Sequence, residues 1–518
     1  MTDNTSNNKR IAKNTLMLYT RMLFTMGVSL FTSRKILQIL GVEDFGIYGV
    51  VGGLVTMFTF LNGGMIAATQ RYLTYEIGRK NEIQLSKIFS TSIQIHALIA
   101  FAVVILSETV GLWFLYEKLI IPPTRLNAAF WVFQCSVIAC IVNIMSIPYN
   151  AAIVAHEKMS AFAYISIFEV SLKLSVVYLL CISDWDKLIV YAILLLLVQF
   201  IIRYIYIYYC KRHFTESKYI HVIDKPLLKE ISSFIGWGFF GSLAHILYTQ
   251  GLNIILNIFF GPVVNAARSI AIQVQNAIQG FVGNFQMALN PQITKNYAIG
   301  NLCQMHSLMF RSARFSFFLL YFLTLPIIIE ADYILTLWLK KVPDNTTIFT
   351  QWILGISLIY TISNPCIIAN QATGKVKNYQ LIVGGILLSI LPISYIALSL
   401  GAPAYSVLVI HFFTECIAQI SRMYLLRRLI NLPIRAYIKN LYIPVLIVAT
   451  LSCLIPLYIH RVLPYGLTRL IFVGLTSIIS IVFFVFLLGL TKNEKILICK
   501  KFKILKKKYY DRLSYKKD

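Results

Sequence analysis

The sequence has few charged side chains, and acidic ones are the scarcest. Charged residues make up 13% of the 518 residues and hydrophobic ones 58%, and there are 21 Asp and Glu against 47 Lys and Arg. A chain this apolar fits neither a set of water-soluble domains nor a disordered protein. The composition therefore predicts an integral membrane protein, and the net charge of +26 needs a separate explanation.

Patterns for disulfide frameworks, metal sites and nucleotide hydrolysis are also missing. The nine cysteines are scattered and odd in number, and most lie in apolar runs, as small buried hydrophobic residues do. No CxxC pair or His/Cys cluster has the spacing of a metal site. There is no Walker A motif, so ATP hydrolysis by this chain is not expected. We expect no metal, no resident cofactor and no catalytic residue.

Long apolar runs are what the sequence has instead. Because roughly 20 apolar residues cross a bilayer, the runs predict an all-α integral membrane protein with about 14 transmembrane helices. The first run is longer than a signal-peptide core and lacks a cleavage site, so we expect it to remain as a helix. The expected spans are 15–40, 45–70, 86–116, 127–155, 159–182, 187–210, 231–260, 262–290, 308–338, 347–371, 378–400, 404–426, 438–459 and 467–490.

Basic residues are distributed unequally between the expected loops. If both termini are cytoplasmic, the inner loops hold roughly five times as many Lys and Arg as the outer loops, which is the positive-inside pattern. This topology accounts for much of the net charge. The basic tail, which includes Lys506, Lys507 and Lys508, is expected to contact anionic membrane lipids rather than nucleic acid, because a tail held at a bilayer meets lipid first.

Two comparisons of the chain with itself indicate an internal repeat. At an offset of 217 residues, SIPYNAAIVAHEK from Ser146 aligns with SNPCIIANQATGK from Ser363. At an offset of 220, the aligned pairs include Gly41 with Gly261, Asn81 with Asn301 and Gln84 with Gln304. Two six-helix lobes that enter the membrane in the same direction would explain both offsets. The expected units are the N-terminal lobe 1–210, a cytoplasmic linker 211–230, the C-terminal lobe 231–428, two additional helices in 429–490 and the basic tail 491–518.

Several charged side chains fall inside the expected spans. A charge in hydrocarbon costs roughly 2.5–3.5 kcal/mol on insertion scales, so each needs a partner, a cavity or a route to the surface. Arg21 and Arg34 lie in the first span, and Arg268 lies in the eighth. Lys173 follows Glu169 by four residues, so the two either form a neutral ion pair or leave Lys173 free for an anionic ligand.

The span 262–290 carries a polar stripe along its whole length. At 100° per residue, its members fall close to one line on the helix surface. They are Arg268, Gln275, Gln279 and Gln286, and Asn62 and Asn253 add amides from two other spans. Lipid cannot cover such a face, so it either lines a wet cavity or packs against another polar helix. A hydrophilic interior with excess positive charge suits a pyrophosphate with a polar appendage and does not suit an organic cation.

Three segments carry a resemblance to a known family. They are ILQILGVEDFGIYGVVGG from Ile36 to Gly53, AATQR from Ala67 to Arg71, and GPVVNAARSIAIQVQNAIQGFVGNFQMALNPQITKNYA from Gly261 to Ala298. Over essentially its whole length the chain resembles the polysaccharide transporter branch of the MATE-like multidrug/oligosaccharidyl-lipid/polysaccharide exporter superfamily. Members of this branch are lipid-linked oligosaccharide flippases of the O-antigen type.

The resemblance implies a function as well as a fold. It implies two six-helix lobes with two additional helices, and alternating access that moves undecaprenyl-diphosphate-linked oligosaccharide across the bacterial inner membrane for lipopolysaccharide or capsule synthesis. The family's arginines for the lipid diphosphate correspond to Arg21, Arg34 and Arg268. The resemblance leaves open coupling to H⁺ or Na⁺ and a polysaccharide polymerase as a partner.

Two other functions stay open. A cation-coupled multidrug exporter of the same fold would need buried carboxylates, and Glu169 would serve only if Lys173 does not neutralise it. A membrane glycosyltransferase or polymerase would need acids outside the membrane, for which the pair Glu43 and Asp44 or the pair Asp184 and Asp186 are candidates. The loops that carry these acids are short for an acceptor site.

Overall fold

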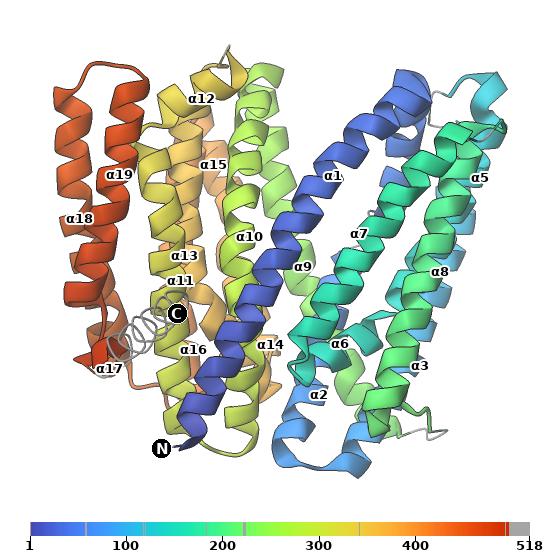
Figure 1. Ribbon diagram of the computed structural model, residues 1–518, viewed down its shortest axis with the longest axis horizontal. Helices are drawn as coiled ribbons and strands as arrows, with labels where there is room; N and C mark the ends of the chain where they lie inside the picture. Colours follow the sequence, from blue (N-terminus) through green and yellow to red (C-terminus); the bar gives the residue numbers. More distant parts are fainter. Residues whose placement is uncertain are drawn as a thin grey trace, which may run out of the picture.

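In the computed structural model, the described residues are 2–496 apart from 57, 59, 118, 120, 183, 221–223, 341 and 493. These residues form helices joined by short turns, and no strand occurs among them. Two helical bundles stand side by side; they meet toward the end of the molecule that holds the N-terminus and separate toward the other end (Figure 1). The predicted all-α membrane fold is confirmed. The part of the basic tail beyond residue 496 lies outside the described residues.

The first bundle runs from the N-terminus to His213. The helix α1 breaks at Gly41, whose φ of 79° and ψ of 173° are not helical, so its two arms correspond to the first expected span and the start of the second. The bounds are α1 Thr2–Thr56, α2 Phe60–Arg79, α3 Glu82–Leu106, η2 Ser107–Gly111, α4 Leu112–Glu117, η3 Pro123–Arg125, α5 Leu126–Ile144, α6 Ile147–Ala155, α7 Met159–Ile182 and α8 Lys187–His213.

The second bundle follows the short helix η4 (Thr215–Ser217) and ends with α16. Its bounds are α9 Lys225–Phe260, α10 Pro262–Ala298, α11 Leu302–Ile329, α12 Ala331–Leu339, α13 Thr346–Thr373, α14 Lys377–Leu388, α15 Ile390–Ser399 and α16 Ser406–Ile430. Within the described residues, ten helices are long and apolar enough to cross a membrane. The expected total of about 14 and the expected unit boundaries stay predictions.

Two additional helices pack against the outer side of the second bundle. They are α18 (Ile443–Val462) and α19 (Leu467–Phe484), preceded by α17 (Ile434–Tyr437) and η5 (Ile438–Tyr442) and followed by η6 (Val485–Gly489). At one end of α11, Glu330 accepts hydrogen bonds from Arg469 at 2.9 Å and from His460 at 2.7 Å. Near the middle of α11, Arg314 forms an ion pair at 2.6 Å with Glu494, which follows η6. Charged contacts therefore attach this part of the chain to one end and to the middle of α11.

The internal repeat is visible in the backbone of the two bundles. Gly41 and Gly261 have left-handed φ values of 79° and 74°, which glycine adopts at little cost. Asn81 and Asn301 cap the helices α3 and α11, and each accepts a hydrogen bond at 3.1 Å from the backbone N–H three residues later. Turns 220 residues apart thus have the same conformation, as the sequence offset predicts.

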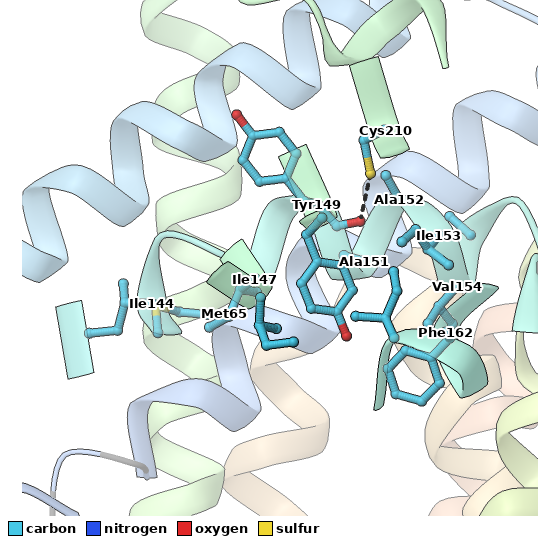
Figure 2. Packing of buried hydrophobic residues seen from close by; sticks show 14 of the residues in the cluster. Met65, Ile144, Ile147, Tyr149, Ala151, Ala152, Ile153, Val154, Phe162 and Cys210 are labelled. Carbon is cyan, nitrogen blue, oxygen red and sulfur yellow. Dashed lines mark hydrogen bonds between the residues drawn. The ribbon is translucent and has the colours of Figure 1, made fainter. Parts of the chain in front are cut away.

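A hydrophobic core holds α2, α6 and α7 together in the first bundle (Figure 2). Met65 of α2 and Ile153 of α6 are both fully buried there. The thiol of Cys210 on α8 donates to the carbonyl of Tyr149 at 3.4 Å, which ties α8 to α6. Between membrane helices such contacts stabilise by close packing rather than by removal of apolar surface from water. The core fixes the helices that surround the cavity described next.

Candidate functional site

A cavity of about 740 Å³ lies inside the first bundle. Residues of α1, α2, α5, α6, α7 and α8 form its wall, and Met287 of α10 adds a contact from the second bundle. Its lining includes the predicted Asn62 together with two charged groups, Glu169 and Arg203. The other lining amides are Gln70, Asn143, Asn150 and Gln199. The wall of the cavity therefore combines these polar side chains with apolar ones.

Two local features of the sequence place polar groups at this wall. On α8, lining residues recur at Gln199, Arg203 and Tyr206, a spacing that puts them on one helical face. The helix α5 ends before Met145, and α6 begins with Pro148 in its first turn, where a missing N–H breaks no helical hydrogen bond. This interruption lies beside the two lining residues Asn143 and Asn150 of α5 and α6.

From the sequence, we interpret Arg203 as a residue that reaches the membrane surface rather than as a site residue. It lies near the end of its expected span, where a long side chain reaches the membrane surface easily. In the structure it is half-buried and lines the cavity. The helical spacing from Gln199 to Tyr206 was the available signal, because it marks a continuous polar face on an otherwise apolar helix.

The cavity wall holds one carboxylate among the described residues, and this carboxylate is paired. Lys173 donates to Glu169 at 2.6 Å, one helical turn away on α7. Glu169 lines the cavity, while Lys173 is 37% exposed. The geometry is that of the intrahelical ion pair, which the sequence left as one of two interpretations of Lys173.

Arg21 lies at the boundary between the two bundles, beside the cavity. Its guanidinium on α1 donates to the side-chain carbonyl of Asn284 on α10 at 3.0 Å. It also lies 4.7 Å from the centre of the Phe162 ring, and Phe162 lines the cavity. The side chain of Arg34, the other predicted cation of this helix, lies outside the described residues.

Arg268 lies in the second bundle and is 4% exposed. It donates to the side-chain carbonyl of Asn253 on α9, and its Nε has no hydrogen-bond partner in the described structure. Arg268 and Asn284, the partner of Arg21, are 16 residues apart on α10, which is about 24 Å along the helix. Arg21 and Arg268 therefore lie at different depths and do not converge on one point in this conformation.

The predicted glutamine stripe of α10 faces α13 at two positions. Gln275 donates to the Ser357 hydroxyl at 2.7 Å, and Gln286 donates to the Thr361 carbonyl at 3.0 Å. These contacts correspond to packing against another polar helix. The side-chain oxygen of Gln279 is buried and has no hydrogen-bond partner in the described structure. Its role as a cavity residue stays a prediction.

Two of the candidate acids of the outer loops are bound to Arg125. The Arg125 guanidinium contacts Asp44 at 2.5 Å and Asp186 at 2.6 Å. Burial alone would raise the pKa of Asp186, but hydrogen bonds from Arg125 and from the backbone N–H groups of Leu188 and Ile189 lower it below its ordinary value. Arg125 of η3 thus joins α1 to the turn before α8, where Asp186 also caps α8.

The two bundles are joined at the end where α2 and α10 finish. Glu157, in the turn after α6, accepts from Lys295 at 2.5 Å and from Gln292 at 2.6 Å, both on α10. Arg71 of α2 donates to the Ala372 carbonyl of α13 at 3.2 Å. We call these contacts the latch. The contacts are similar in the two directions. The helix α10 of the second bundle binds the turn after α6 in the first, and α2 of the first bundle binds the end of α13 in the second.

The sequence similarity to a known family covers more than half of the chain. Residues 11–297 match the family described as polysaccharide biosynthesis protein. The chain belongs to this family. No curated protein matches the sequence.

Solved structures of transporters share the fold of this polysaccharide biosynthesis protein. An outward-facing MATE family transporter of the MOP superfamily has a TM-score of 0.69 at 12% identity, over 81% of this chain and 96% of its own. The MATE transporter ClbM in complex with Rb⁺ has a TM-score of 0.67 at 16% identity, over 82% and 97%. A MOP superfamily transporter from Pyrococcus furiosus, whose binding pocket is described as having reverse polarity, has a TM-score of 0.66 at 12% identity, over 82% and 96%.

Family and fold together give the broad class of the molecule. The chain is a multi-pass membrane protein of polysaccharide biosynthesis, and its fold is that of exporters in the MATE-like superfamily. The family's description names polysaccharide biosynthesis, and the fold is shared with solved transporters.

Proposed function

We propose that the protein flips undecaprenyl-diphosphate-linked oligosaccharide across the bacterial inner membrane by alternating access, for lipopolysaccharide or capsule synthesis. In this proposal it is not an enzyme, and both termini are cytoplasmic. The oligosaccharide head enters between the bundles and reaches the cavity of the first bundle, while the prenyl tail stays in lipid.

The observation that carries the proposal is the set of charged and amide side chains at the wall of the first bundle's cavity. Its wall combines five amides with Arg203, which forms no ion pair with a described residue, and its one described carboxylate, Glu169, is neutralised by Lys173. Arg21 adds a second guanidinium beside it. Amides and hydroxyls suit sugar hydroxyls, and guanidinium groups suit phosphate oxygens.

In this proposal, Arg268 and Arg21 bind the diphosphate one after the other along the transport path, and they do not bind it at the same time. Arg268 lies near the end where the bundles separate, and Arg21 lies about 24 Å deeper along α10. In alternating access the diphosphate would pass from one guanidinium to the other as the bundles reorient. Coupling to H⁺ or Na⁺ stays part of the proposal, with Glu169 as the carboxylate in the cavity wall.

The alternative, a MATE-type cation-coupled multidrug exporter, needs an acidic cavity. The one described carboxylate at the wall is already bound to Lys173. No described contact of this cavity therefore favours a cationic drug over an anionic head group.

Substitution of Arg203 tests the proposal. Loss of one charge-assisted hydrogen bond to a diphosphate costs about 1.5–3 kcal/mol, so Arg203→Gln should slow flipping of a fluorescent prenyl-diphosphate oligosaccharide in reconstituted vesicles roughly tenfold or more. Arg212→Gln is the matched control, because Arg212 lies on the same helix but is exposed and away from the cavity. Equal rates for the two variants would contradict the assignment.

A further inference from the structure

A second cavity lies at the latch end of the second bundle and takes no part in the proposed transport path. Its volume is about 810 Å³. The start of α9, the turn between α13 and α14 and the end of α16 enclose it, and Tyr72 of α2 reaches it from the first bundle. Both bundles therefore contribute to its wall.

The wall of this cavity is strongly positive. Three separate elements supply the four cations Lys229, Lys375, Lys377 and Arg428. Glu230 is the one acid described at the wall, and it accepts a hydrogen bond from the Tyr72 hydroxyl at 3.0 Å. In the described part of the chain, none of the four cations is in an ion pair with an acid. Four cations against one carboxylate around one hollow favour an anionic occupant.

The start of α14 adds a second attraction for anions. Lys377, the first residue of α14, lines the cavity, and so does Val376 at the N-cap. Val376 has no side chain that could accept from the first-turn N–H groups. Helix N-termini carry a partial positive charge and bind phosphate oxygens through these groups.

An apolar and aromatic wall continues from the cations along the helices. It includes Phe234, Trp237 and Ile382, and the side chain of Ile382 is 44% exposed. The ammonium of Lys377 lies 5.4 Å from the centre of the Trp237 ring. Tryptophan and lysine side chains placed together in this way are typical of the membrane interface, where one ligand has a charged head and an apolar body. A free inorganic anion would leave the apolar wall unused.

We propose that this cavity binds the phosphate head group of an anionic membrane lipid, with the acyl chains along the apolar wall. Because Tyr72 belongs to the first bundle and the cations belong to the second, the lipid contacts both bundles beside the latch. It therefore stabilises the conformation in which this end of the molecule is closed.

Native mass spectrometry of the delipidated full chain tests the site independently of transport. Phosphatidylglycerol, phosphatidylcholine and inorganic phosphate are the three probes. The triple variant K229Q/K375Q/R428Q should bind phosphatidylglycerol at least about fivefold more weakly than the native chain, since each basic residue near a lipid surface contributes about 1 kcal/mol. The matched control is K211Q/R212Q/K218Q, which removes three exposed cations outside the cavity.

The proposal expects the control variant and the native chain to bind phosphatidylglycerol equally and phosphatidylcholine much more weakly. Equal loss in both triple variants would show that only the net charge matters and would overturn the site. Full displacement of the lipid by inorganic phosphate would assign the cavity to a free anion instead. If the triple variant does not fold, Lys375→Gln alone must still weaken binding of phosphatidylglycerol, because Lys375 is exposed in a turn.

Discussion

Two buried arginines of the second bundle differ in their partners. Arg422 is 2% exposed and binds the Glu415 carboxylate at 2.7 Å, the Tyr379 hydroxyl at 3.1 Å and the Ser363 hydroxyl at 3.0 Å. Arg268 is equally buried but contacts an amide and no described carboxylate. A buried charge that is paired belongs to the packing, whereas an unpaired one costs free energy and needs a function.

This contrast predicts opposite effects for the same substitution. Arg268→Met should lower flipping roughly tenfold or more and leave the melting temperature of the purified protein unchanged or higher. Arg422→Met leaves Glu415 buried without its partner and should destabilise the protein by roughly 3–5 kcal/mol. Thermal unfolding and vesicle flipping, measured on both variants, check the pair. A large loss of thermal stability with unchanged flipping in Arg268→Met would make Arg268 a structural residue.

The sequence predicted which helix faces are polar better than it predicted which residues those faces contact. Lys173 and Glu169 are one helical turn apart, so their ion pair follows from the helix alone. The partners of Gln275 and Gln286 lie on α13, some 75 or more residues away in the chain. Periodicity marks a polar face, but it carries no information on which helix or cavity that face meets.

At the scale of helices and turns, the latch is the feature that the proposed movement must break. The Lys295–Glu157 ion pair is largely buried, so it is screened little by salt. Gly78 on α2 packs closely against α10: a Cβ at Gly78 would lie 3.0 Å from the Cβ of Ala298. Small residues permit such approach between membrane helices, and separation of the bundles must open this contact.

A disulfide between these two positions should stop transport. In Gly78→Cys/Ala298→Cys, the two Cβ positions are 3.0 Å apart, about half an ångström below the usual disulfide range, so a small outward shift of the helices allows the bond, which would hold this end of the bundles closed. Flipping should fall to background under oxidation and recover with reductant. Each single variant is the control, and both should flip under either condition. Full activity of the oxidised, cross-linked protein would show that this end does not open.

Elements were predicted well where local sequence decides them. The turns at Gly41 and Gly261 and the caps at Asn81 and Asn301 need only a residue and its neighbours, and their repeat offset of 220 holds in the structure. The ends of α1 and α10 were not predicted, since both helices continue into polar residues beyond the expected spans. Hydropathy identifies the residues that lie in the membrane, but a helix can continue beyond the membrane surface into polar residues.

At the scale of the molecule, the bundles meet at one end and separate toward the other (Figure 1). The latch lies at the closed end, and the cavity of the first bundle lies beside Met287 of the second. In the proposed alternating-access cycle, this arrangement would be the state that is closed at the N-terminal side. The sequence predicted two lobes, but the state in which they stand depends on contacts between distant residues.

The central claim is that this exporter accepts an anionic lipid-linked sugar rather than a cation. Vesicles containing the purified full chain, loaded in parallel with an undecaprenyl-diphosphate oligosaccharide and with a cationic dye, test it most directly. The account predicts that the protein flips the oligosaccharide faster than protein-free vesicles do and leaves the distribution of the dye unchanged, with or without an ion gradient. Dye movement driven by an H⁺ or Na⁺ gradient, with no flipping of the oligosaccharide, would contradict it.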